Sequence, residues 1–278
     1  MHPHVTVSGF PSFPDGPMRP PRLFTATLLL AAAAPLGAQQ RDPDAFRQDT
    51  PLAAGRTVHL HNVNGGISAA RAGGDRVEVR AEKQWRRGDP ASVRIEQRTA
   101  ANGDLVVCVL WYEAECTDRG IRGGRTRWNN RDDVSVAVTV RVPDGVHLDL
   151  HTVNGGVTAE GVAGMVDAET VNGSITARST GGPVRAETVN GSIRATLGAL
   201  GRDDLRYKAV NGSITLELPA DANAALVLET VNGSVSTDFP VTVQGRLSRK
   251  SLRGTVGSGG RRIEASTVNG SITLRRPG

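Results

Sequence analysis

The sequence has few aromatic residues and no long helical pattern. Aromatic residues make up only 4% of its 278 residues, whereas it contains 33 glycines and 15 prolines. These two residue types interrupt the chain so often that no helical pattern of twelve residues runs unbroken after residue 40. Val, Thr and Ser dominate outside the N-terminus, which favours an all-β protein of short strands. The length is sufficient for one large domain or two modest ones.

No apolar run is long enough to cross a bilayer as a helix of the mature protein. The longest run starts at Leu23, follows two arginines and leads into a small-residue segment that closes at Ala38. This layout predicts a secretory signal peptide, with Met18 as the start of translation and residues 1–17 as an upstream extension. No cysteine follows the run, which argues against a lipoprotein anchor. We expect residues 39–54 to form a flexible linker.

The chain has only two cysteines, Cys108 and Cys116, in the segment CVLWYEAEC. Two cysteines without further ligands or a tighter motif do not make a metal site or a redox pair. In an exported protein an even count at close spacing predicts a structural disulfide.

The chain has no large excess of charge of one sign. The formal net charge is +5, and removing residues 1–38 takes away two arginines and one aspartate, which leaves about +4. On an exported protein this mild excess favours contact with acidic envelope polymers, and we expect no nucleic acid partner.

The sequence does contain a short repeated motif. The string TVNGSIT occurs at residues 170–176 and again at 267–273, and related strings place a Val before and a Gly after each of seven asparagines. From the second copy onward the spacings are 18, 18, 21, 21 and 37 residues. The asparagines are Asn64, Asn154, Asn172, Asn190, Asn211, Asn232 and Asn269.

Apolar and polar residues alternate on both sides of each Asn-Gly, so each copy is predicted to be a strand, a tight turn and a second strand. Asn and Gly tolerate left-handed backbone angles, which suits a sharp reversal or a corner. Because equal positions carry near-identical residues in successive copies, we predict a right-handed β-solenoid or β-helix-like stack of strand-turn-strand repeats of about 18–21 residues. An antiparallel meander or β-sandwich is the alternative.

We expect one β-repeat domain over residues 55–278, with regular repeats over 146–278. Residues 73–142 contain longer loops and all three tryptophans, and we interpret them as a widened, irregular part of the same domain. The 37-residue gap leaves room for a degenerate copy with its turn near Gly257. The last copy is followed by LRRPG, whose charges and proline would protect an exposed strand edge.

The repeated TVNGSI units, the phrase ELPADANAALVLETVNGSV and the closing segment LRGTVGSGGRRIEASTVNGSITL resemble the bacterial putative-adhesin family of secreted β-strand-repeat domains. The resemblance covers roughly residues 55–278. It implies a repetitive β structure in the cell envelope and a binding or structural role. The family has no established catalytic residues to carry over.

Five copies contain Asn-Gly-Ser, the acceptor pattern for glycosylation, but two copies lack the Ser. Turn chemistry explains all seven copies, so we do not assign a glycosylation role. Stacked rungs would place His151, Glu169 and Glu187 about 5 Å apart, a set that could bind a divalent metal or simply form a solvated face. We predict no metal and no cofactor. Calcium-binding repeats are excluded because the glycine-rich turn lacks their aspartates.

Catalytic patterns are missing as well. The chain contains no Gly-x-Ser-x-Gly elbow with a suitable His and acid, and its Asp pairs lie in polar loops. One loop, residues 116–133, departs from the repeat pattern and could dock polyanions or sugars, or could be a solvated hairpin tip. Its candidate ligand residues are Arg119, Arg122, Arg125, Arg127, Trp128 and Arg131.

These observations predict an exported, non-enzymatic, adhesin-like or structural module of the cell envelope. Its partner would be an envelope polymer or a protein, and its location the periplasm, the outer-membrane surface or the extracellular space. Two other hypotheses stay open. One is an envelope stress or sensing accessory that binds a protein through a strand edge, and the other is a polysaccharide-active enzyme.

Overall fold

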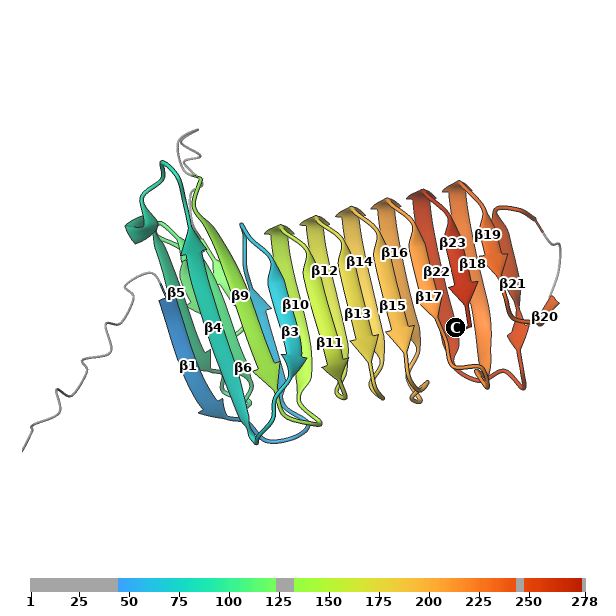
Figure 1. Ribbon diagram of the computed structural model, residues 1–278, viewed down its shortest axis with the longest axis horizontal. Coiled ribbons are helices and arrows are strands. Elements are labelled where there is room, and N and C mark those ends of the chain that lie inside the picture. Colours follow the sequence, from blue (N-terminus) through green and yellow to red (C-terminus); the bar gives the residue numbers. More distant parts are fainter. Residues whose placement is uncertain (1–44, 124–132, 244–247, 277–278) are drawn as a thin grey trace, which may run out of the picture. The chain divides into compact units, whose positions relative to one another are not determined.

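The computed structural model describes residues 45–123, 133–243 and 248–276, and all of them belong to one compact unit. This unit consists of two large sheets and one small hairpin (Figure 1). Within the described ranges the only helical element is the single 3-10 turn η1 (Pro90–Ser92). None of the described residues form a helix long and apolar enough to span a membrane.

The first large sheet has ten strands. In spatial order they are β1 (Ala45–Pro51), β4 (Arg76–Gln84), β9 (Ser135–Val142), β3 (Ile67–Arg71), β11 (Val157–Val162), β13 (Ile175–Ser179), β15 (Ile193–Leu197), β17 (Ile214–Glu217), β23 (Ile272–Arg275) and β19 (Val235–Thr237).

The second large sheet has eleven strands. In spatial order they are β20 (Val241–Val243), β21 (Ser251–Val256), β18 (Ala224–Asn232), β22 (Arg262–Asn269), β16 (Leu205–Asn211), β14 (Val184–Asn190), β12 (Val166–Asn172), β10 (His147–Asn154), β2 (Thr57–His61), β6 (Leu105–Trp111) and β5 (Val93–Thr99). The separate hairpin is β7 (Glu115–Thr117) with β8 (Gly120–Arg122).

Each repeat copy is one rung that contributes a strand to each sheet. The first strand of the copy joins the eleven-stranded sheet, the chain turns at Asn-Gly, and the second strand joins the ten-stranded sheet. Equivalent strands of neighbouring rungs pair in parallel and in register, for example Ala168 with Ala186 and Ile175 with Ile193. The predicted β-solenoid-like stack is therefore confirmed, and antiparallel pairs occur only toward the two ends of the sheets.

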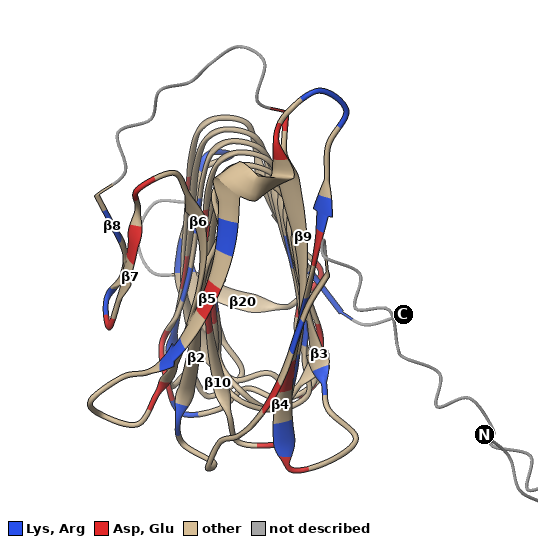
Figure 2. Ribbon diagram, turned by 90° about the vertical axis from the view of Figure 1, so that its left-hand side faces the viewer, with Lys and Arg blue, Asp and Glu red and all other residues tan. Residues whose placement is uncertain are grey.

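The core lies between the two sheets, which face each other in the end-on view (Figure 2). Most inward side chains of the rungs are aliphatic, with Tyr207 as an aromatic exception, and those of successive rungs form one continuous buried cluster. Alternation with period two explains this arrangement, since every second side chain of a strand points to the same side of its sheet. Burial of these columns supplies most of the hydrophobic free energy of the fold.

The stacking order of the last copies differs from the order along the chain. The Asn211 rung pairs with the Asn269 rung, and the Asn269 rung then pairs with the Asn232 rung. The reason is that β21 runs antiparallel along the far edge of β18 and occupies it, so the final copy inserts on the other side.

Two predictions based on chain order are wrong for this reason. Strand β23 lies between β17 and β19, so the segment after it does not protect a sheet edge. Gly257 does not turn a hidden rung, because β21 belongs to no rung and the turn at Gly257, with φ of 58°, leads back from β21 toward β22.

The linker expected over residues 39–54 is also partly wrong. Residues Ala45–Pro51 form β1, which pairs antiparallel with β4 from end to end. The alternation of Phe46 and its polar neighbours is weak, but backbone hydrogen bonding to β4 holds the segment in the sheet. Residues 73–142 contribute β4 and β9 to one sheet and β5 and β6 to the other, and thereby extend both sheets beyond the first rung.

Candidate binding surface

The seven repeat asparagines lie where the chain leaves the eleven-stranded sheet at each corner. Their side-chain amides form a ladder that runs from rung to rung with N···O distances of 2.7–2.9 Å. In each step the amide nitrogen of one Asn donates to the amide oxygen of the neighbouring rung, starting at Asn154 and ending at Asn232. Asn64, in the first rung, instead donates to the carbonyl of Val134. The ladder satisfies polar groups that the corner would otherwise leave unpaired.

The glycine of each corner is required for close approach of backbones. A Cβ atom on Gly173 would lie 2.0 Å from the carbonyl oxygen of Gly155, and one on Gly212 would lie 1.8 Å from that of Gly191. The sequence argument from left-handed angles is therefore wrong for most copies. Among the seven corner glycines only Gly65 and Gly191 have a positive φ, of 124° and 159°. Stacking distance, more than backbone angle, explains the glycine.

A buried threonine two residues before the Asn stabilises five of the seven corners. Thr170 donates its hydroxyl to the carbonyl of Gly155 in the neighbouring rung at 2.8 Å, and Thr188 does the same to Gly173. Thr152, Thr230 and Thr267 make the equivalent bond at 2.8–3.0 Å. These hydroxyls are almost fully buried. The corner is thus a structural device, and its functional interest lies in the outward rows beside it.

One outward row of the eleven-stranded sheet contains the polar positions that the sequence singled out. In spatial order it comprises His61, His151, Glu169, Glu187, Lys208, Ser266 and Glu229. The three residues considered as metal ligands do stand side by side. Nδ1 of His151 lies 3.2 Å from a carboxylate oxygen of Glu169, and Lys208 pairs with Glu187 at 3.1 Å.

Sequence reasoning missed a group of His and Asp side chains at the N-terminal end of this row. Nδ1 of His59 and Nε2 of His151 each lie 2.6 Å from a carboxylate oxygen of Asp149. Nε2 of His59 also lies 3.4 Å from Asp104. The signal available in the sequence was the shared alternation in the segments HLH and HLDLH, which puts these residues on one face once β2 is paired with β10.

The pKa values of this group follow from its contacts. Burial would raise the pKa of Asp149, but hydrogen bonds and positive charge from His151 and His59 outweigh it and hold the pKa at about 2. The hydrogen bond to Asp149 raises the pKa of His151 against the opposing effect of burial. For Asp167, burial and the charges of Asp149 and Glu169 raise the pKa. The group therefore places one imidazole of raised pKa among several carboxylates.

Metal binding is not supported by this geometry. Both ring nitrogens of His151 face carboxylates, so neither lone pair is directed at a common point with Glu169 and Glu187. Across the three described ranges, no three or more His, Cys, Asp or Glu side chains are arranged to hold a metal ion.

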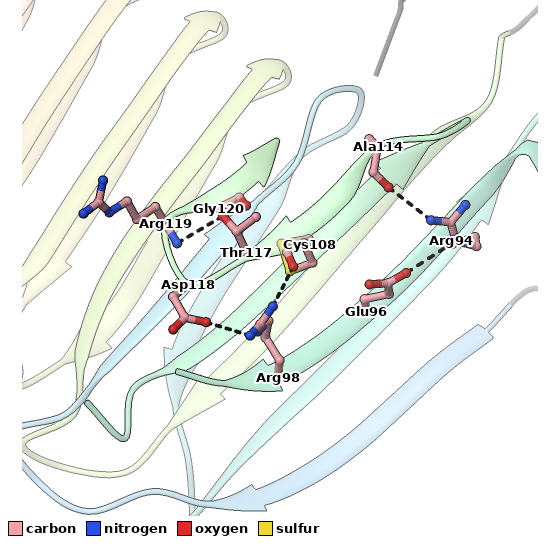
Figure 3. The surroundings of a disulfide bond; sticks show 10 residues. Arg94, Glu96, Arg98, Cys108, Ala114, Thr117, Asp118, Arg119 and Gly120 are labelled. Carbon is pink, nitrogen blue, oxygen red and sulfur yellow. Dashed lines mark hydrogen bonds and ion pairs between the residues drawn. A yellow bond between two sulfur atoms is a disulfide. The ribbon is translucent and has the colours of Figure 1, made fainter. Parts of the chain in front are cut away.

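The hairpin β7–β8 lies on the outer side of the eleven-stranded sheet (Figure 2). The predicted disulfide between Cys108 of β6 and Cys116 of β7 is present, with Cα atoms 5.7 Å apart. Arg98 of β5 adds an ion pair to Asp118 at 2.8 Å and a hydrogen bond to the carbonyl of Cys116 (Figure 3). A small second core beneath the hairpin contains Cys108 and its neighbours Val106 and Leu110.

The hairpin leads into the arginine-rich loop that the sequence predicted as a ligand site. Arg119 lies in the hairpin turn, where its backbone N–H donates to the hydroxyl of Thr117 (Figure 3). Arg122 is the last residue of β8. The other members, Arg125, Arg127, Trp128 and Arg131, lie outside the described residues. At the end of the loop, Asp133 accepts hydrogen bonds from the backbone N–H groups of residues 86–88, which lower its pKa to about 2.

The middle of the eleven-stranded sheet carries a charged hollow of about 400 Å³. Acidic and basic side chains line it, among them Asp167, Glu169, Arg185, Glu187, Arg206 and Glu264. Several of these are already engaged, for example Arg206 with Glu264 at 3.7 Å. The hollow offers both signs of charge to a ligand and lies between two rows of the same sheet face.

The outward face of the ten-stranded sheet carries a hydroxyl row. Its members, in spatial order, are Ser68, Thr158, Thr176, Arg194, Thr215, Thr273 and Ser236. Only Arg194 interrupts it. Neighbouring rungs of a sheet lie about 4.8 Å apart, so this face presents one hydroxyl at nearly every such step.

One protein-family model matches more than half of this chain. The family described as Toastrack DUF4097 matches residues 127–275, which is 149 of the 278 residues and thus more than half of the chain. No curated protein matches the chain.

Two solved structures illustrate what the chain is similar to. One, named a putative cell adhesion protein, is from Clostridium sporogenes and has 10% identity over 84% of this chain and 100% of its own, with a TM-score of 0.47. Another, named a putative adhesin, is from Bacteroides fragilis and has 10% identity over 84% of this chain and 98% of its own, with a TM-score of 0.31. At these scores we draw no inference from either structure.

Proposed function

We propose that this chain, which belongs to the Toastrack DUF4097 family, is an exported and non-enzymatic binding module of the cell envelope, with an adhesin-like role. The observation that carries the proposal is the in-register stack of outward rows on both sheets. A surface with one polar side chain at every rung suits an extended ligand whose own groups repeat, such as an envelope polymer.

Charge indicates which polymers fit best. The chain has an excess of basic residues after removal of its first 38 residues, and the hairpin β7–β8 leads into five arginines within thirteen residues. Arg185 and Arg206 bring two further guanidinium groups to the hollow on the same sheet. Guanidinium groups pair well with phosphate and carboxylate, so we favour acidic envelope polymers such as lipopolysaccharide.

A retention experiment tests this function. The chain without residues 1–38 would be passed over immobilised lipopolysaccharide and over cell-wall fragments, and the retained fraction measured against salt concentration. We expect retention that weakens as salt rises, because exposed charges are screened. A loop variant with Arg119, Arg122, Arg125, Arg127, Trp128 and Arg131 replaced by Ala should lose retention.

A matched control removes arginines from the opposite sheet. The double variant Arg178→Ala and Arg194→Ala lowers the net charge on the exposed face of the ten-stranded sheet, where both side chains are more than half exposed. It should keep most of the retention. Equal retention of the loop variant and the wild type would contradict a role of the loop. Release of soluble sugar from the polymer during the assay would contradict the non-enzymatic assignment.

A second candidate function is recognition of a protein through a strand edge. Strands β1 and β19 each have one neighbour in the ten-stranded sheet, and β5 and β20 each have one in the eleven-stranded sheet. Such edges can accept an added strand from a partner. Recovery of one defined envelope protein with the chain from cross-linked cells, lost when Pro is introduced into β5, would favour this function over polymer binding.

A further inference from the structure

An apolar ridge runs along the eleven-stranded sheet, next to the asparagine ladder. One valine stands before the Asn of each rung and points outward, and six of them are 37–57% exposed. In spatial order they are Val153, Val171, Val189, Val210, Val268 and Val231. Five steps between rungs give the ridge a length of about 24 Å.

The ridge is unusual for its position. The other two outward rows of these six rungs are charged or polar except at Val227, whereas this row carries the same β-branched aliphatic residue in all six rungs. Single exposed valines need no explanation, but a contiguous row of them exposes enough apolar surface to mark a contact site.

Both ends of the ridge are defined by the fold. At the N-terminal end the hairpin β7–β8 covers the first rung, where a Cβ on Gly120 would lie 2.7 Å from the ring of His61. At the other end, among the described residues, β21 pairs with β18 only as far as Glu229, and the carbonyl of Lys250 then accepts a hydrogen bond from the backbone N–H of Thr230. The side chain of Val231 remains 57% exposed. The open ridge therefore comprises six rungs, with its centre between Val189 and Val210.

The charged row beside the ridge is self-complementary about that centre. Two residues before each valine stand, in spatial order, His151, Glu169, Glu187, Lys208, Ser266 and Glu229. A two-fold axis between the third and fourth rungs would set Glu187 opposite Lys208 and His151 opposite Glu229. In the remaining pair Glu169 would face Ser266, which carries no charge. A two-fold axis along the ridge, which gives a parallel arrangement, would instead set this row opposite the asparagine side of the partner's ridge and would form none of these pairs.

We propose that two copies of this chain associate antiparallel along the valine ridge, with the two-fold axis between Val189 and Val210. The ridges exclude water from each other, and the adjacent charged row selects the antiparallel orientation. The proposal is independent of which ligand the protein binds. It commits to a second copy of the chain as the occupant of the ridge.

The next row outward limits the extent of the contact. It contains Asp149, Asp167, Arg185, Arg206, Glu264 and Val227. Under the same axis Arg185 would face Arg206, and Asp167 would face Glu264, which are pairs of like charge. Repulsion keeps the two faces apart in this row, so the contact is confined to the ridge and its neighbouring row, and the charged hollow stays open to solvent. A contact this narrow gives a weak dimer, with a Kd of about micromolar order.

Analytical ultracentrifugation of the chain without residues 1–38, over a range of concentrations, tests the association. We expect a monomer–dimer equilibrium. Val189→Lys places two cations near the axis and should raise the Kd at least tenfold. The matched control is Val243→Lys, since Val243 is 37% exposed but lies in β20, away from the ridge. A strictly monomeric wild type, or equal effects of the two variants, would overturn the proposal.

Exchanging the charges at Glu187 and Lys208 distinguishes an effect on dimerisation from an effect on the stability of the single chain. Glu187 and Lys208 already pair inside the chain at 3.1 Å, so Glu187→Lys or Lys208→Glu alone breaks that pair and also opposes the dimer. Mixing the two variants leaves both internal pairs broken but sets Lys opposite Glu across the axis. We expect dimers in the mixture and fewer in either variant alone. Failure of the mixture to recover dimers would contradict the proposed contact.

Cross-linking tests the relative orientation of the two copies. In the antiparallel dimer Val153 lies opposite Val231, whereas the two copies of Val153 are about 24 Å apart. A short bis-maleimide should therefore join Val153→Cys to Val231→Cys in a mixture but should not join Val153→Cys to itself. Efficient self-linking of Val153→Cys would show a parallel arrangement and overturn the proposal.

Discussion

The imidazole ring of His61 stacks on that of His151, with 5.0 Å between ring centroids and 9° between ring planes. Ninety residues separate them in the chain, and parallel pairing of β2 with β10 brings them together. Their environments differ. Burial, with the neighbouring His151, lowers the pKa of His61 to about 4, whereas the hydrogen bond to Asp149 raises the pKa of His151. The pKa values of the two stacked imidazoles are thus shifted in opposite directions.

The first prediction concerns pH. Because the folded pKa of His61 lies below its unfolded value of 6.5, the unfolded chain binds a proton that the folded chain does not. The contribution of neutral His61 is complete above pH 6.5 and is lost as the pH falls toward 4, by up to about 3 kcal/mol. His61→Gln should therefore flatten the decline of the free energy of unfolding between pH 6.5 and 4.5, measured by urea denaturation.

His151→Gln serves as the control with the opposite sign. The raised pKa of His151 in the wild type contributes stability that is present below pH 6.5 and is lost as the pH rises through the pKa of the folded state. Asp149, with a pKa of about 2, changes charge below the range of the experiment. Identical pH profiles for His61→Gln and the wild type would show that His61 is solvated in solution.

The second prediction concerns the corner glycines. Gly173→Ala places a Cβ atom 2.0 Å from the carbonyl oxygen of Gly155. Neither this Cβ atom nor the carbonyl can move away without a shift of the backbone. We expect a loss of about 3–5 kcal/mol in the free energy of unfolding. Gly181→Ala is the matched control, because no atom lies within 4 Å of its Cβ position. A wild-type denaturation midpoint for Gly173→Ala would refute the close-approach explanation.

The third prediction concerns one of the two rungs that lack the buried threonine, the other being the first rung, which has Asn62 at that position. Ala209 occupies that position beside Gly191, and no side-chain hydroxyl of the described residues donates to the Gly191 carbonyl. Ala209→Thr should supply the missing hydrogen bond and raise the free energy of unfolding by about 1 kcal/mol. Thr188→Ala should lower it by a similar amount. The two changes can be compared in one series of urea titrations, where shifts of the same sign would contradict the proposed role of the hydroxyl.

The fourth prediction concerns a buried hydroxyl. Tyr207 is fully buried in a column that the two neighbouring rungs fill with alanine, and its hydroxyl has no hydrogen-bond partner among the described residues. Burial also raises the pKa of this phenol. Tyr207→Phe removes the unpaired group and keeps the ring, so we expect the protein to gain about 1–2 kcal/mol. Thermal denaturation would show this as a higher Tm, and a lower Tm would indicate that the hydroxyl finds a partner in solution.

Sequence reasoning recovered what depends on neighbouring residues. The alternation around each Asn-Gly gave the strands and corners, and the short spacing of Cys108 and Cys116 gave the disulfide. It did not recover the group of His59, Asp104 and Asp149, because these residues lie 45 or more positions apart and meet only after the sheets form. Strand β1 was missed for the same reason, since its pairing with β4 stabilises it more than its own weak pattern does.

The sequence by itself determined the repeating unit: which side chains point inward, where the chain turns, and that like residues stack on like. Only the tertiary structure decided the order of the rungs. The columns of different copies are so similar that any copy can stack on any other, so local sequence carries almost no preference among them. The antiparallel strand β21 occupies one edge of β18 and directs the final copy to the other, which puts Ser266 between Lys208 and Glu229. That order creates the self-complementary charged row beside the valine ridge.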